Sequence, residues 1–137
     1  MRFIIMAITG NETEAAAPPP PKPEAFVAMQ EYNEQAVKDG VLLAAEGLTP
    51  QSKGARVKFR GEERLVIDGP FTESKEVIAG FSIIRADSLA DAIEWVKRAP
   101  NVSPTGGGVV EIRKLMDVED FGEGFTPNEE IAKVKFC

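Results

Sequence analysis

The sequence contains no histidine and only one cysteine, Cys137. Serine–histidine and cysteine–histidine catalysis are therefore excluded, and so is zinc bound by histidine. A single cysteine cannot form an internal disulfide, which is typical of a protein in the reducing cytoplasm. Any acid–base chemistry must come from carboxylates, lysines, the single tyrosine or water. Because no calcium-loop spacing occurs either, we expect neither a metal nor a cofactor.

Basic charge is also scarce, since the chain has 16 lysines and arginines against 22 aspartates and glutamates, a net charge of -6. Nucleic acids need a basic surface and anionic membranes attract one, so neither is an expected partner. No apolar run approaches the roughly 20 residues of a membrane-spanning helix. Residues 3–8 are apolar, but Glu12 and Glu14 follow where a signal peptide would have a cleavage site, which favours a first strand.

The 137 residues are enough for one domain with its own core. Hydrophobic periodicity and turn residues predict strands at 3–8, 41–45, 77–86 and 109–115, and a hairpin at 55–67. They also predict a first helix that begins at Pro23 or Glu24 and ends at Asp39-Gly40, and a second helix at 88–98. A proline-rich loop at 9–23 precedes the first helix. Without the hairpin this order is βαββαβ, a ferredoxin-like α+β arrangement in which both helices cover one sheet face. We expect a second copy of the chain to cover the other face, in a homodimer.

The strand at 77–86 has two unlike faces. Its odd positions, including Phe81 and Ile83, form an apolar face that is expected to join the core. Its even positions, including Gly80 and Ser82, are smaller and more mixed, which leaves room for a ligand. Ser82 is therefore a candidate substrate-binding residue.

Residues 67–77 read IDGPFTESKEV and place turn residues, an aromatic residue and charges between two apolar runs. Asp68 is the candidate catalytic residue, as a general acid or base at the mouth of a cavity. The other interpretation is a turn, because aspartate accepts hydrogen bonds from nearby backbone N–H groups. Gly69 and Pro70 would then set the backbone angles that follow. Both interpretations can hold at once.

Five further residues are candidates for substrate binding: Phe71, Thr72, Glu73, Lys75 and Glu46. The polar side chains of the motif could bind an anion or a polar small molecule. They could equally form a solvated loop, in which paired surface charges contribute at most about 1 kcal/mol. Phe71 is either a ligand platform or a packing anchor. Glu46 ends an apolar strand, and it could act as an acid if the fold brought it close to Asp68.

Residues 66–76, VIDGPFTESKE, resemble the signature of the DGPF-domain proteins, a branch of the YCII-related superfamily. Other segments are similar to that family's first strand (3–6), second strand and its exit (40–42 and 46–48), third strand and second helix (79–95), and closing strand (110–113). The resemblance covers residues 1–115. It implies a bacterial-type, ferredoxin-like subunit that dimerises like the dimeric α/β barrels, with a domain at 1–116 and an acidic extension at 117–137.

The resemblance implies less about activity. Most DGPF-domain proteins have no assigned reaction, while the superfamily includes a dehydrochlorinase-like enzyme and members with a histidine–aspartate pair. This chain lacks the histidine, so of that pair only Asp68 is present. Two functions stay open. One is a small-molecule-binding protein, enzymatic if a carboxylate acts on a small metabolite. The other is a non-catalytic regulatory or interaction dimer, in a sigma-factor-linked or stress context, with the DGPF motif as a structural turn.

Overall fold

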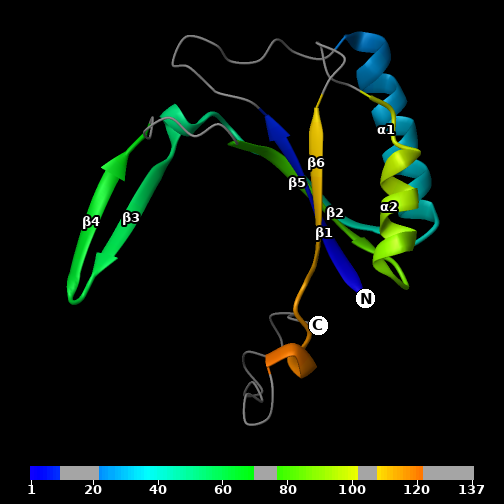
Figure 1. Cartoon of the computed structure of the whole chain (residues 1–137). Coiled ribbons are helices and arrows are strands. Elements are labelled where there is room, and N and C mark those ends of the chain that lie inside the picture. Colours follow the sequence, from blue (N-terminus) through cyan, green and yellow to red (C-terminus); the bar gives the residue numbers. More distant parts are fainter. Residues whose placement is uncertain (10–21, 70–76, 102–107, 122–137) are drawn as a thin grey trace.

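The computed structural model describes residues 1–9, 22–69, 77–101 and 108–121 (Figure 1). These contain β1 (Arg2–Thr9), α1 (Pro23–Lys38), β2 (Leu42–Gly47), η1 (Gln51–Lys53), β3 (Ala55–Arg60), β4 (Glu63–Asp68), β5 (Val77–Arg85), α2 (Leu89–Lys97), β6 (Val109–Lys114) and η2 (Val118–Phe121). A four-stranded antiparallel sheet has the order β2-β5-β1-β6, and β3 and β4 form a separate antiparallel hairpin. The chain is therefore an α+β protein, and this order is consistent with the expected ferredoxin-like arrangement with an inserted hairpin.

The helix ends follow the residues that the sequence offers. α1 begins at Pro23, whose fixed φ suits the first helical position. After α1, Gly40 adopts a φ of 72°, which favours glycine over any residue with a side chain. α2 is capped by Ser88, whose Oγ accepts a hydrogen bond of 3.1 Å from the backbone N–H of Asp91.

Both helices lie on one side of the four-stranded sheet, and the core lies between these two layers (Figure 1). Phe3 and Ile5 on β1, Ile84 on β5 and Ala92 on α2 are buried together. Partly buried residues pack around this cluster, namely Val41, Leu42, Ala86, Trp95, Val96 and Ile112. The covered face of the sheet is thus the face that carries Phe3, Ile5 and Ile84.

The predicted assignment of the two faces of β5 is wrong. Ile84, at an even position, pairs with Phe3 and is fully buried, so the even positions from Gly80 onward face the helices. Phe81 and Ile83 lie on the other face and are only partly buried. A bulge at Ala79 then reverses the alternation, which explains why Val77, at an odd position, is only 7% exposed.

Gly80 does not leave room for a ligand, because the backbone of β2 already lies against it. A Cβ atom at this position would lie 2.9 Å from the backbone oxygen of Glu46. Glycine therefore permits the close approach of β2 to β5.

The β3–β4 hairpin extends from the side of the sheet that the helices leave uncovered (Figure 1). Its register places Val57 opposite Val66 and Phe59 opposite Arg64, and every residue of both strands is exposed. Gly61 occupies the turn with a φ of 58°. A two-stranded hairpin alone is marginally stable in water. Contacts at the base of the hairpin are therefore expected to contribute to its stability.

The first residues after β6 are held back onto that strand. The Nζ atom of Lys114 lies 3.0 Å from Oδ2 of Asp120 and 3.6 Å from Oδ2 of Asp117. A hydrogen bond from the backbone N–H of Asp117 and the pairing with Lys114 lower the pKa of Asp120. The boundary between a domain at 1–116 and an extension at 117–137 stays a prediction.

Candidate functional site

The DGPF motif begins at the base of the hairpin. Asp68, the candidate catalytic residue, is the last residue of β4 and is exposed to solvent. It pairs across the hairpin with Ala55, at the end farthest from the turn. Four predicted substrate-binding residues, Phe71, Thr72, Glu73 and Lys75, lie outside the described residues.

Gly69 has a packing role that only glycine can fill. Its backbone N–H donates a 3.0 Å hydrogen bond to the carbonyl oxygen of Gly54, which continues the hairpin beyond the pair of Ala55 and Asp68. A Cβ atom at Gly69 would lie 1.8 Å from the backbone oxygen of Gln51, a distance that forces the backbone to move. The Asp-Gly step thus closes the hairpin against η1. This contact supports the structural interpretation of the glycine, and it assigns no chemistry to Asp68.

The two remaining predicted residues, Glu46 and Ser82, belong to the four-stranded sheet, whereas Asp68 belongs to the hairpin. Glu46 lies on β2 opposite Phe81, so it shares the uncovered face of the sheet with that ring. Ser82 lies opposite Ile5 and Ala45, on the covered face. Successive side chains of a strand point to opposite faces, so Ser82 and Glu46 belong to different environments.

We call the side of the four-stranded sheet that neither helix covers the open face. Its centre is apolar, because Ile4 and Met6 of β1 lie opposite Ile83 and Phe81 of β5. All four are only partly buried although they stand on the two middle strands. Apolar groups left accessible to water in this position favour the docking of another layer or of a ligand.

The charged residues of the open face are segregated along the strands. Two carboxylates flank the row of Met6 and Phe81, with Glu46 on β2 and Glu111 on β6. Toward the other end of the sheet stand three arginines, namely Arg2 on β1, Arg85 on β5 and Arg113 on β6. These arginines are not among the residues predicted from the sequence, because their common face becomes visible only once the register of the strands is known. The available signal was an arginine next to or near the end of three predicted strands, with Arg2 just before 3–8, Arg85 in 77–86 and Arg113 in 109–115.

Arg2 is the unusual member of this group. Its Nε atom is buried and has no hydrogen-bond partner among the described residues. A buried donor left unsatisfied costs about 1–3 kcal/mol, and more when the group is charged. Such a group calls for an explanation, and a role in binding an acceptor group is one.

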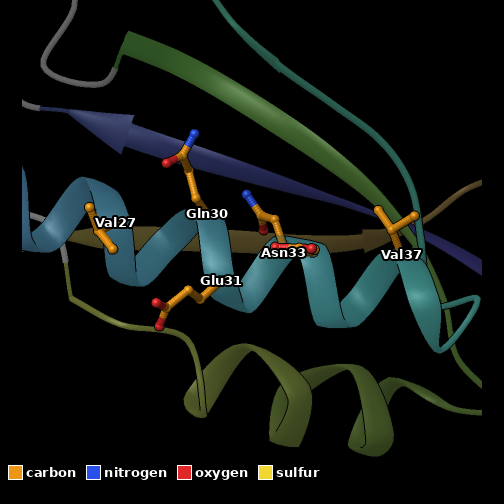
Figure 2. Close-up of a pocket in the computed structure, with 6 residues that line it drawn as sticks. Val27, Gln30, Glu31, Asn33 and Val37 are labelled. Carbon is orange, nitrogen blue, oxygen red and sulfur yellow. The ribbon is translucent and has the colours of Figure 1, made fainter.

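A shallow groove lies elsewhere, along α1 (Figure 2). It has a volume of about 580 Å³ and is lined by Val27, Gln30, Glu31, Asn33, Glu34 and Val37. These residues all belong to one helix, and they do not include any of the predicted site residues. The groove is therefore a depression on the helix surface rather than a pocket between elements.

The single tyrosine is used in packing. The Tyr32 hydroxyl donates a hydrogen bond of 2.5 Å to the carbonyl oxygen of Trp95, and the two ring centroids lie 4.9 Å apart. Burial raises the pKa of Tyr32 to about 12, although the charge of Arg98 acts in the opposite direction. The polar group of this side chain is therefore satisfied by the backbone of α2.

Within the described ranges, no group of three or more histidine, cysteine, aspartate or glutamate side chains is placed to hold a metal ion. No helix among these residues is long and apolar enough to cross a membrane.

These features define an α+β protein with one covered and one open sheet face and an exposed hairpin that carries an Asp-Gly closure. The chain belongs to the YCII-related family, whose domain model matches residues 1–119. It is also similar to an uncharacterised protein, R00369, of Rhizobium meliloti strain 1021, with 34% identity over 79 residues. That match covers 58% of this chain and 63% of the relative, so this chain spans less than two thirds of the relative's length.

Proposed function

We propose that the chain forms a homodimer through the open face and binds a small molecule there, in the manner of a dimeric α/β barrel. The supporting observation is the apolar centre of the open face, made by Ile4, Met6, Phe81 and Ile83 on the two middle strands, while both helices lie on the other side. A second copy would add the layer that buries this centre. The charged residues at the ends of the face would then border a cavity between the two sheets.

A lysine at the centre of the open face tests the dimer. We expect the wild-type chain to sediment at twice the chain mass of 14.9 kDa. We expect Phe81→Lys to sediment as a monomer, because an unpaired ammonium group is strongly unfavourable in a buried interface. Val37→Lys is the matched control, since Val37 on α1 is 60% exposed on the helix side of the molecule. A wild-type monomer, or a Phe81→Lys dimer, would contradict the proposal, provided that circular dichroism shows both variants folded.

In this dimer, Asp68 is the proposed acid or base, because it is an accessible carboxylate at the base of a hairpin on the uncovered side of the sheet (Figure 1).

A second candidate function is a non-catalytic regulatory or interaction dimer in which the motif is a structural turn. The packing of Gly69 against Gln51 favours this alternative.

The variant Asp68→Asn distinguishes the catalytic role of Asp68 from the role of the motif as a structural turn. A screen of small metabolites by thermal shift first identifies a ligand, since a ligand at 100 times its dissociation constant adds about 2.7 kcal/mol of stability. The catalytic role predicts an unchanged melting temperature and ligand shift, with turnover of that ligand lost. The turn role predicts a lower melting temperature and no turnover in the wild type.

A further inference from the structure

We propose that Arg2, Arg85 and Arg113 bind the anionic group of a small molecule, a carboxylate or a phosphate carried on an apolar body. Together these residues make up the arginine cluster. This inference rests on the proposed function in one respect, which is that the small molecule binds on the open face.

The strand register brings the three side chains to one end of this face. Arg2 of β1 stands directly opposite Arg85 of β5. Arg113 of β6 stands opposite Ile4, two residues along β1 from Arg2, and therefore on the same face. Cross-strand Cβ atoms lie about 5 Å apart when directly opposite and about 7–8 Å apart on the diagonal, within reach of long side chains. Three guanidinium groups can thus converge on one anion.

The charges of the cluster are not neutralised within the described part of the chain. Like charges directly opposite each other destabilise a sheet, yet the ion pairs found among these residues do not include the three arginines. The carboxylates of Asp117 and Asp120, which follow β6, pair instead with Lys114. Lys114 stands opposite Phe3, on the covered side of the sheet. A bound anion would supply the missing negative charge.

The buried Nε of Arg2 gives a second, independent indication. It is a hydrogen-bond donor shielded from water, and no acceptor for it lies in the part of the chain that the structure describes. Arginine binds carboxylates and phosphates through parallel N–H donors of its planar guanidinium group. An anion held by Arg2 and Arg85 could accept the hydrogen bond that this Nε lacks.

The cross-strand pairs next to the arginine cluster indicate the chemistry of the rest of the ligand. Next to the arginines stand Ile4 and Ile83, followed by Met6 and Phe81. These side chains would pack on an apolar body attached to the anionic group. Glu46 and Glu111 flank the row of Met6 and Phe81 and would repel a second anionic group at that end. The expected ligand therefore carries its negative charge at one end.

Calorimetric titration of the full chain at constant ionic strength tests the site, with inorganic phosphate, phenyl phosphate and benzoate as probes. We expect saturable binding of phenyl phosphate or benzoate, and the tighter of the two identifies phosphate or carboxylate as the preferred group. Inorganic phosphate should bind at least tenfold more weakly than phenyl phosphate, because it lacks the apolar body.

Arg85→Gln combined with Arg113→Gln should raise the dissociation constant of the preferred probe at least tenfold. Arg2→Lys keeps the positive charge but removes the Nε donor, and it should also weaken binding. Arg60→Gln is the matched control, because Arg60 is an exposed arginine on the hairpin, and it should change the constant less than twofold. Equal binding by all variants, or no saturable binding of any probe, would overturn the inference.

Sedimentation of the same samples separates this inference from the dimer. A wild-type dimer that binds no probe overturns the anion site and leaves the dimer intact. A monomer whose probe binding depends on Arg85 and Arg113 supports the anion site and overturns the dimer.

Discussion

The molecule contains two antiparallel strand pairs that differ in what covers them. In the middle pair of the large sheet, Phe3 is 1% exposed and Ile84 is fully buried beneath the helices. In the β3–β4 hairpin, Phe59 is 70% and Val66 is 68% exposed. Both pairs have a regular register over most of their length. The same backbone hydrogen bonding therefore occurs with and without a packed layer above it.

This comparison shows that strand pairing and burial are separate outcomes. The hairpin gains local support from its base, where Gly69 bonds to Gly54, and from the guanidinium group of Arg64, which lies 4.5 Å from the centre of the Phe59 ring. The large sheet gains its stability from the apolar surface that the two helices remove from water. Substitutions should therefore have very different effects in the two regions.

The largest expected difference is between two phenylalanines. Phe3→Ala should lower the free energy of unfolding by about 3–5 kcal/mol, because it leaves a cavity in the core. Phe59→Ala should change it by only about 0.5–1 kcal/mol, the value of an exposed contact between an arginine and an aromatic ring. Urea denaturation of both variants measures the two values. A cost at Phe59 as large as that at Phe3 would mean that another layer covers the hairpin in solution.

A smaller effect is expected from a methyl group at the base of the hairpin. Gly69→Ala should destabilise the protein by about 1–3 kcal/mol, because the added Cβ forces the backbone around Gln51 to move. Gly54→Ala is the matched control in the same turn, since its Cβ would lie at an ordinary 3.5 Å from the same oxygen. Thermal unfolding gives the stability, and amide hydrogen exchange shows whether β3 and β4 open. Equal exchange rates in the two variants would argue against Gly69 as the closure of the hairpin.

The smallest effect on stability is expected in the helices that cover the large sheet. Tyr32→Phe removes the hydrogen bond to Trp95 and should cost about 0.5–1.5 kcal/mol near pH 7. The folded protein holds the Tyr32 proton up to a pKa of about 12, whereas an unperturbed tyrosine has a pKa of 10.0. The unfolded chain therefore binds fewer protons between these values, and stability is complete below pH 10 and falls as the pH rises toward 12.

Urea denaturation of the wild type and of Tyr32→Phe from pH 8 to pH 12 tests this sign. The variant should lose less stability across the alkaline range than the wild type does. Parallel curves would show that Tyr32 has the same pKa in the folded and unfolded states.

The arrangement of elements along the chain could be predicted because its signals are local. Pro23 and Gly40 bound the first helix, Ser88 caps the second, and an alternating pattern with a turn at Gly61 identifies the hairpin. The prediction failed for the faces of β5. The bulge at Ala79 and the approach of β2 to Gly80 depend on partners distant in the sequence.

The candidate site was predicted less well for the same reason. The motif predicted a turn or a catalytic Asp68, and both interpretations stay predictions, since residues 70–76 lie outside the described residues. It gave no sign that Glu46 and Ser82 would face opposite sides of the sheet. The arginine cluster was missed altogether, since its members come from the ends of three strands.

By itself, the sequence determined the α+β class, the order of its strands and helices, and the absence of histidine chemistry. These properties depend on residue type and on spacing within one element. Only the tertiary structure decided that Phe3 and Ile84 share the core while Phe81 meets the open face, and that Arg2, Arg85 and Arg113 stand together. The physical reason is the two-residue period of a strand, in which a single bulge or a shift in register exchanges the two faces.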